Sequence, residues 1–258
     1  MTEYIGNDLQ DSYFDQVDLS GTRFHSCDMS KVEFRAVDMT GVTMRSVDLF
    51  DVMIDGSIHN VVINGVDVGP LIEAELDRRT PLRVKMRPTS PEGFVQAWDV
   101  IERLWRETVE RARRLPLATL HESVNGEWSF IETLRHLTFA TDSWLRRAVL
   151  GDPSPWDALG LPWDEMPDTD GVPRDRVARP SLDAVLELRQ ERMDLMRRYL
   201  ESLDEISLDA HTTPVEGPGW PPPRSFEVRR CLLIILNEEW EHRRFAERDL
   251  DILESQGA

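Results

Sequence analysis

The first third of the chain repeats with a period of five residues. Aligned in fives from Ser12, it reads SYFDQ, VDLSG, TRFHS, CDMSK, VEFRA, VDMTG, VTMRS, VDLFD and VMIDG. The third position of each unit is a large apolar residue, and the first is mostly small or β-branched. Neither an α-helix nor a flat β-strand repeats every five residues. Two inward side chains in each unit, with a turn at each corner, predict a square coil of β-structure.

Residues 12–66 resemble the pentapeptide-repeat family in this pattern. The resemblance implies a right-handed quadrilateral β-helix with four pentapeptides to each coil. Nine or ten units would make two to three coils, a plug on the order of 10–15 Å long at the usual spacing of stacked strands. Some members of the family mimic DNA with a long acidic rod, and this coil is too short for that role. Cys27 occupies an inward slot, so we expect it to be a small core residue and not a nucleophile.

The repeat ends before a segment rich in proline and charge, residues 67–89, which is predicted to be a linker with one short helix from Pro70 to Arg79. Residues 90–258 then carry four amphipathic patterns with a period near 3.6, which predict a four-helix bundle. The whole chain is therefore expected to be a multidomain α+β protein, with a short β-helix followed by a helix bundle.

Three of the four helices have a recognisable start. The first begins with Ser90 as its N-cap and a proline at the first helical position. The second opens with a capping box, Ser129 and Glu132, and is predicted to run to about Leu150. The third starts at Ser181 after a proline, and the fourth is predicted to span residues 225–253.

Two long loops interrupt the bundle, residues 151–180 and 204–224. Loops of this length in a compact domain are either disordered or functional. They contain Trp156, Trp163 and Trp220, which favour packing of the loops over another part of the bundle. Their pattern does not separate a structural role from a functional one.

Composition narrows the class of protein. Forty-eight acidic and 30 basic residues give a net charge of −18, which disfavours binding to nucleic acids or to anionic membranes. No run approaches the roughly 20 apolar residues of a membrane span. The N-terminus is polar and acidic, unlike a signal peptide, and the two cysteines are far apart in the sequence. These features predict a cytoplasmic protein.

Two helical segments carry potential metal ligands. Glu238 and His242 lie four residues apart on the fourth helix and therefore share one face. His136, on the second helix, lies on a face of small and polar residues that could line a cavity. A carboxylate and two imidazoles from two rigid helices are a possible metal-ligand set with open positions for water or substrate. The spacing alone favours a hydrogen-bonded core histidine at position 136 and an ordinary helical ion pair between Glu238 and His242 over a metal site.

Residues 90–255 closely resemble the DinB-like superfamily, through segments that include NGEWSFIETLRHLTFATDSWL and RRCLLIILNEEWEHRRFAERDLDIL. The resemblance implies an up-up-down-down four-helix bundle. It also implies a divalent metal held by one histidine of the second helix and an E-x-x-x-H pair of the last helix. These positions are His136, Glu238 and His242 here, with Glu239 as a competing ligand. The glutamate-containing pattern is similar to that of mycothiol-dependent maleylpyruvate isomerases, and DinB-like proteins are often homodimers.

The resemblance implies a metal-dependent thiol S-transferase that uses a low-molecular-weight thiol of the mycothiol type and an electrophile. Zinc is the first choice of metal, with nickel or iron as alternatives, because two nitrogens and a carboxylate do not select one metal. Glu132 or Asp249 could order the substrate. The alternative is a non-catalytic scaffold that consists of a pentapeptide-repeat plug on a helix bundle, which has no need for the three ligands to converge.

Overall fold

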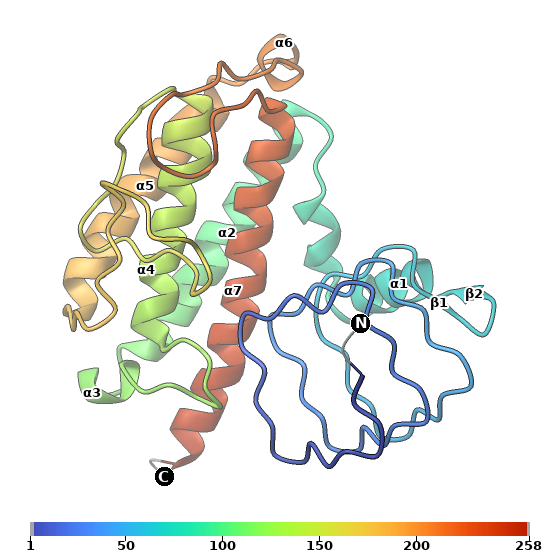
Figure 1. The fold of residues 1–258 in the computed structure, drawn as a ribbon. Helices are drawn as coiled ribbons and strands as arrows, with labels where there is room; N and C mark the ends of the chain where they lie inside the picture. The colour runs from blue at the N-terminus through green and yellow to red at the C-terminus, as the bar shows by residue number, and fades with distance from the viewer. Residues whose placement is uncertain (1–2, 257–258) are drawn as a thin grey trace. The chain divides into compact units, whose positions relative to one another are not determined.

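The computed structural model describes residues 3–256. The chain divides into two units, Met1–Ser57 and Ile58–Ala258. The first is a coil built from the repeats, and the second is a helix bundle preceded by a short hairpin (Figure 1).

The backbone of the first unit turns at every fifth residue. Residues with positive φ recur at this interval from Gly6 to Gly56, including Gln16, Ser26 and Ala36 at 52°, 53° and 51°. Aspartate side chains ten residues apart accept a hydrogen bond from the backbone N–H two residues later, which is a local turn motif. These aspartates are Asp8, Asp18, Asp28 and Asp38, with distances of 2.8–3.0 Å. The period of five predicted from the sequence is thus present in the backbone itself.

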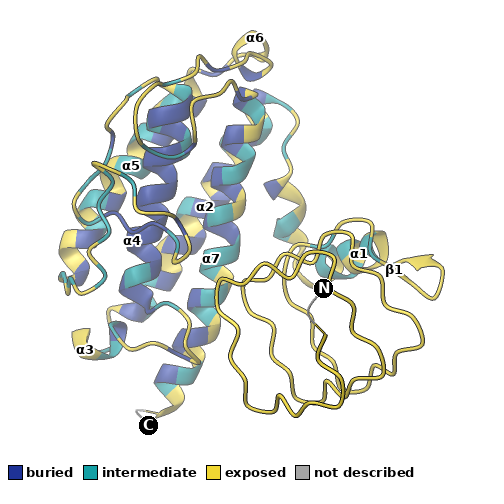
Figure 2. Ribbon diagram, viewed as in Figure 1, coloured by how far each residue is buried: buried dark blue, intermediate teal, exposed yellow. Residues whose placement is uncertain are grey.

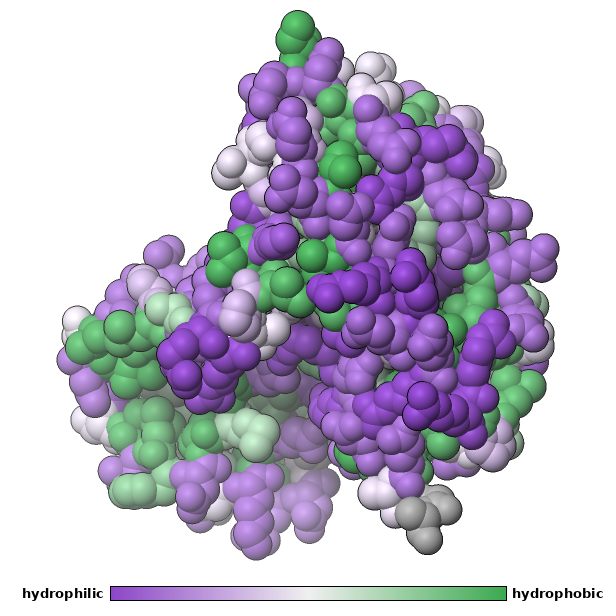
Figure 3. All heavy atoms as spheres, turned by 180° about the vertical axis from the view of Figure 1, so that it is seen from behind, coloured by the Kyte–Doolittle hydropathy of each residue, from purple (hydrophilic) through white to green (hydrophobic). Residues whose placement is uncertain are grey.

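The apolar side chains of this coil are not packed into a core. Every described residue up to Ser57 is exposed (Figure 2), and apolar atoms are visible over this unit in Figure 3. Phe24 is 61% exposed, and Cys27, expected in the core, is exposed. The backbone hydrogen bonds given for these residues are turn bonds such as Thr22 to Leu19, and no strand is formed among residues 3–57. Because no ladder draws successive coils together, the inward side chains stay open to water. The packed β-helix is therefore not confirmed.

A hairpin and two short helices precede the bundle. Strands β1 (Val62–Ile63) and β2 (Val66–Asp67) pair antiparallel across Asn64 and Gly65. Both turn residues have positive φ, 50° and 84°, as a type I′ turn requires. Helix α1 (Gly69–Arg79) occupies the position of the predicted short helix, and a 3-10 helix, η1 (Pro81–Met86), follows it. The sequence pattern did not indicate η1.

Four long helical segments form the bundle. They are α2 (Pro91–Ala112), α4 (Phe130–Thr141) continued without a break by the π-helical η2 (Asp142–Val149), α5 (Leu182–Glu201) and α7 (Val228–Gln256). Two single-turn helices, α3 (Leu117–Leu120) and α6 (Glu205–Leu208), lie in the connections. The predicted starts of the first three helices are confirmed, whereas the fourth begins at Val228 and not at residue 225. Ser90 and Ser181 cap their helices by accepting from the N–H of the residue three positions on, and Ser129 forms the full capping box with Glu132.

The helices run up-down-down-up, and the expected up-up-down-down order is wrong. Arg111 near the end of α2 bonds Glu254 near the end of α7 at 2.8 Å, so these two helices are parallel. Arg113, just after α2, bonds Asp183 at the start of α5 at 2.7 Å, so α5 is antiparallel to α2. The end of η2 packs against the start of α7, so α4 is antiparallel to α7.

The lengths of the connections explain this order. An up-up-down-down bundle needs two connections that run its whole length. Here residues 113–129 join α2 to α4 at one end of the bundle, and residues 202–227 join α5 to α7 at the other end (Figure 1). Only residues 150–181, the crossover loop, return along the bundle, which makes α4 and α5 parallel.

The inner faces of these helices form one apolar core (Figure 2). Helix α4 packs against both α5 and α7, and α2 packs against the same two helices. Of α4, all residues except Glu132 are buried, including polar ones such as His136 and Arg135. Among the described helices, none is both long enough and apolar enough to cross a membrane.

Candidate metal centre

Helix α4 presents His136 to the interior of the bundle. The capping box at Ser129 fixes the start of the helix two turns earlier. His136 is only 6% exposed, so its imidazole is held among packed neighbours and has little freedom to turn away. A buried imidazole must place both of its nitrogens against partners.

Helix α7 supplies the other two predicted ligands from the face opposite His136. Residues four apart on a helix are neighbours along one stripe, and Glu238 and His242 use that spacing. Their side chains are 29% and 19% exposed, so they lie where the α4–α7 interface opens toward solvent. The apolar run from Leu232 to Leu236 anchors the preceding turns of α7 in the core.

The three side chains converge. Glu238 Oε2 lies 3.4 Å from His136 Nε2 and 3.1 Å from His242 Nε2, and one ligand atom from each of the three residues lies within 4.8 Å of the other two. The imidazole centroids of His136 and His242 are 4.9 Å apart. Two nitrogens and a carboxylate oxygen from two rigid helices have the chemistry of a divalent transition-metal site with open positions.

The hydrogen bond made by Nδ1 of His136 determines whether Nε2 can bind a metal. Nδ1 lies 2.9 Å from the carbonyl oxygen of Leu161 in the crossover loop. Because a carbonyl oxygen only accepts hydrogen bonds, Nδ1 carries the proton, and Nε2 of the neutral ring carries a lone pair. That lone pair faces the Glu238 carboxylate, so two acceptors point at each other. A cation between them would turn this repulsion into coordination, and a histidine whose other N–H is bound to a carbonyl is the usual form of a metal ligand.

Burial and hydrogen bonding set the charges of the cluster. Burial lowers the pKa of His136 below its ordinary value, so the imidazole is neutral near pH 7. Burial by itself raises the pKa of Glu238, but the two neighbouring imidazoles, of which His242 is a hydrogen-bond partner at 3.1 Å, outweigh that effect and hold its pKa well below the usual range. The cluster at neutral pH therefore offers a carboxylate and a neutral His136, which is the protonation that metal binding requires.

Trp128 covers the histidines. Its ring lies 4.5 Å from the His136 ring, centroid to centroid, and stacks on His242 at 5.7 Å with an interplanar angle of 11°. The indole Nε1 donates to Asp164 of the crossover loop at 3.2 Å. Sequence reasoning gave Trp128 no role, although its position directly before the capping box places it at the mouth of the α4–α7 groove.

The tryptophans of the two long loops pack near the cluster, as the sequence favoured. Trp156 stacks on Phe139 at 5.4 Å, and Trp163 contacts the same ring at 6.3 Å. Trp163 also meets Trp220 of the other loop edge-on at 4.9 Å. Phe139 itself lies 6.2 Å from the His136 ring. The loops are thus joined to each other and to the helical turn that follows His136.

Glu239, the competing ligand, lies outside the cluster. Its carboxylate is 1% exposed and accepts two hydrogen bonds from Arg189 of α5, at 3.1 and 2.7 Å. The Arg189 guanidinium in turn lies over the Trp105 ring at 4.8 Å. Glu239 is therefore fully engaged in a buried ion pair between α5 and α7.

The two residues proposed to order a substrate differ in availability. Glu132 is held in the capping box by the backbone and hydroxyl of Ser129, at 2.9 and 2.7 Å. Asp249 is 8% exposed and bonds Arg248 through one oxygen at 2.8 Å. With Trp128 and Thr133 it lines a cleft that is too narrow to hold a water molecule. Asp249 remains a candidate for contact with a substrate, whereas Glu132 is used as a helix cap.

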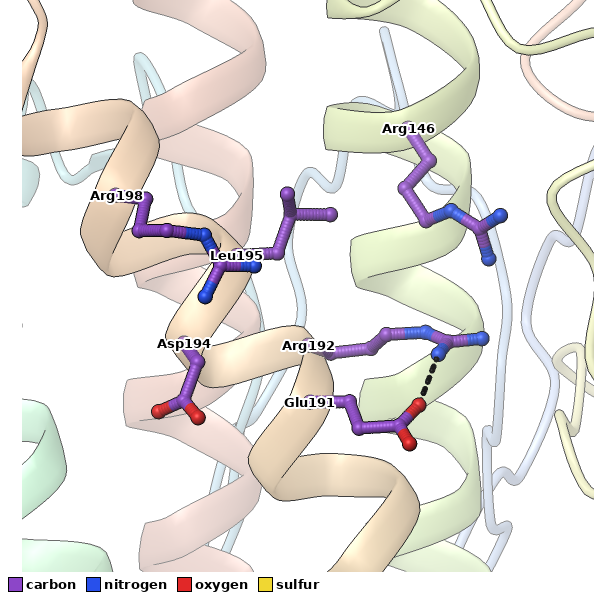
Figure 4. Close-up of a pocket in the computed structure, with 6 residues that line it drawn as sticks. All are labelled: Arg146, Glu191, Arg192, Asp194, Leu195 and Arg198. Carbon is purple, nitrogen blue, oxygen red and sulfur yellow. Dashed lines mark hydrogen bonds and ion pairs between the residues drawn. The ribbon is translucent and has the colours of Figure 1, made fainter.

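A larger cavity, of about 370 Å³, lies elsewhere between η2 and α5. It is lined by Arg146, Glu191, Arg192, Asp194, Leu195 and Arg198 (Figure 4). Arg146 and Arg192 both bond the buried Asp142. Arg192 also bonds Glu191 at 3.1 Å, and Figure 4 shows this contact. No residue of the histidine cluster lines this cavity, and much of its positive charge is already paired.

Comparison with known families agrees with this architecture. The sequence profile of the DinB superfamily matches residues 101–246, and the chain belongs to that superfamily. A profile of pentapeptide repeats matches eight copies over residues 8–45. No curated protein and no solved structure gives a significant match to the chain. Together, the superfamily membership and the His136, Glu238 and His242 cluster fit a metal-binding DinB-like protein.

Proposed function

We propose that the protein is a metal-dependent thiol S-transferase whose metal is held by His136, Glu238 and His242. The observation that carries the proposal is the convergence of one possible ligand atom from each of these residues within 4.8 Å, together with the Leu161 contact that keeps the proton of His136 on Nδ1 and leaves Nε2 with its lone pair. Zinc is the expected metal, with nickel or iron as alternatives.

A divalent cation at this site would lower the pKa of a thiol bound to it, so that the thiol becomes nucleophilic near neutral pH. The thiol proton would leave to solvent, and the thiolate sulfur would bond to the electrophilic carbon as that carbon releases a leaving group or the electron pair of its double bond moves to the neighbouring atom and is protonated from solvent. Glu238 would supply one negative charge to hold such a cation. Trp128 shields the histidines on one side, and Asp249 and Thr133 are polar groups of the adjoining narrow cleft.

No cysteine of the chain is required for this chemistry. Cys231 is buried, and burial raises the pKa of its thiol to about 11, so it stays protonated. Cys27 lies in the repeat unit. We therefore infer that the reacting sulfur belongs to a small cosubstrate of the mycothiol type.

The test is thiol consumption by the metal-loaded protein. Mycothiol and other cellular thiols are offered one at a time with a generic electrophile, and loss of free thiol is followed against the His136→Ala protein. Faster loss with the unmodified protein is the expected result for at least one thiol. Equal rates for every thiol would favour the alternative, a non-catalytic scaffold.

We also infer that the repeats form a right-handed quadrilateral β-helix in solution. The support for this fold is a backbone residue with positive φ at every fifth position. Two free cysteines and the absence of a membrane-spanning helix among the described residues are compatible with the proposed cytoplasmic location.

A further inference from the structure

Arg135 is a buried guanidinium next to His136 in the sequence. It is fully buried, and its described hydrogen bonds go to carbonyl oxygens and not to carboxylates. Nε donates to Leu159 at 2.8 Å and Nη2 to Asp175 at 2.5 Å. The third nitrogen, Nη1, is buried with no hydrogen-bond partner in the described part of the chain.

Arg135 and His136 hold the same short piece of the crossover loop from two sides. The Arg135 side chain binds the carbonyl of Leu159, and its own backbone carbonyl accepts from the N–H of Leu161 at 3.3 Å. The carbonyl of Leu161 then accepts from His136 Nδ1 at 2.9 Å. The orientation of the Leu161 carbonyl therefore depends on contacts that Arg135 makes.

Burying the Arg135 guanidinium in this way costs folding free energy. A buried guanidinium that hydrogen-bonds no carboxylate loses its hydration, and the Asp175 and Glu132 carboxylates offset this loss only by attraction from a distance. Only the planar fork of an arginine reaches two carbonyls at fixed angles, which a lysine cannot reproduce. The residue is thus suited to fixing a loop in one geometry more than to stabilising the fold by charge.

We propose that Arg135 is a positioning residue of the metal centre, which places the Leu161 carbonyl and so fixes the tautomer and orientation of His136. The inference rests on the proposed function, because it assigns a purpose to the metal ligand that Arg135 acts through. Arg135 itself does not touch the metal or the reacting atoms.

Arg147 provides a matched control within the same chain. It is 1% exposed and also holds loops through carbonyls, those of Pro153, Val215 and Gly217 at 2.7, 3.1 and 2.8 Å. None of these contacts involves Leu161 or His136. A purely structural role of buried arginines would make the two residues equivalent.

The experiment compares Arg135→Met, Arg147→Met and the conservative Arg135→Lys in the full-length protein. Zinc affinity is measured by chelator competition, and the thermal midpoint of the metal-free protein reports general destabilisation. We expect Arg135→Met to weaken zinc binding by about 10-fold or more, the usual effect of losing support for a ligand. Arg147→Met should lower the midpoint without changing the affinity, and Arg135→Lys should recover part of the affinity.

A second readout needs no metal. The nitrogen chemical shifts of His136 in the metal-free protein distinguish the two neutral tautomers, and we expect Nδ1–H in the unmodified protein and a mixture in Arg135→Met. An unchanged tautomer, or an equal loss of zinc affinity in both methionine variants, would overturn the proposal. If the unmodified protein binds no zinc, the proposed function fails, and the tautomer measurement alone decides the role of Arg135.

Discussion

Arg189 binds both carboxylate oxygens of Glu239, at 3.1 and 2.7 Å, so the neighbour of Glu238 in sequence is committed to the core. Adjacent positions on a helix differ by about 100° in direction. This rotation sends Glu238 to the histidine cluster and Glu239 to α5. Two adjacent glutamates therefore have different roles, which makes them a matched pair for mutation.

The first prediction separates these roles. Glu239→Gln leaves Arg189 buried without its counter-charge and should destabilise the fold by about 3–5 kcal/mol, while the metal ligands remain in place. Glu238→Gln should weaken zinc binding and leave the stability of the fold nearly unchanged, because it removes the negative charge of the cluster but no buried ion pair. Urea unfolding and zinc titration of both variants check this, and equal loss of zinc affinity in the two would contradict it.

The second prediction concerns pH. The pKa of His136 is lowered by burial, so below the ordinary histidine pKa of 6.5 the unfolded chain binds a proton that the folded chain does not. Stability of the metal-free protein should therefore fall as the pH drops below about 6.5 and be constant with respect to this group above it. Urea unfolding at a series of pH values measures the slope.

The His136→Gln protein is the control for that slope. The amide can still donate to Leu161 but does not titrate, so the acid loss of stability should become smaller. An identical slope in both proteins would show that other groups cause the acid sensitivity.

The third prediction concerns the thiols. Cys27 is exposed and Cys231 is fully buried with a pKa raised to about 11. A thiol reagent at neutral pH should therefore leave Cys231 unmodified in the folded chain and modify it in denaturant, whereas Cys27 should react in the folded chain only if the repeat unit is open. The Cys27→Ser protein should show no rapid reaction when folded, and modification of Cys231 at a comparable rate would contradict the packing around the start of α7.

The fourth prediction concerns the two units. Residues 58–258 should fold alone, because η1 packs against α2 and α7 and belongs to the bundle. Circular dichroism of this fragment should be strongly helical, and its zinc affinity should equal that of the full chain. Subtracting the spectrum of the fragment from that of the full chain gives the contribution of the repeat unit. A contribution without β character would contradict the proposed β-helix.

Local sequence signals predicted the local structure well. The capping serines at 90, 129 and 181 and the apolar periods fixed the helix starts, because these are decided by neighbouring residues. The order of helix directions was wrong, since it depends on the path of the crossover loop, which contains no periodic signal. The coil interior was also not confirmed, because packing between successive turns is a long-range property that a period of five does not guarantee.

The same division applies to the site. The i, i+4 spacing of Glu238 and His242 and the family resemblance were enough to nominate three residues, which the fold brings together. The Leu161 carbonyl, Trp128 and Arg135 could not be found in this way. Every residue has a backbone carbonyl, so the residue types do not show which loop carbonyl will contact a ligand. An arginine in a helix is predicted to be exposed, because the sequence does not show which loop residues will bury it.

The most direct test of the central claim is the zinc content of the purified protein, measured by elemental analysis after zinc loading and removal of unbound metal. The proposed site predicts one equivalent per chain in the unmodified protein and none in the His136→Ala, His242→Ala double variant, which should remain helical by circular dichroism. A full equivalent retained by the folded double variant would contradict the assignment of the metal to this cluster.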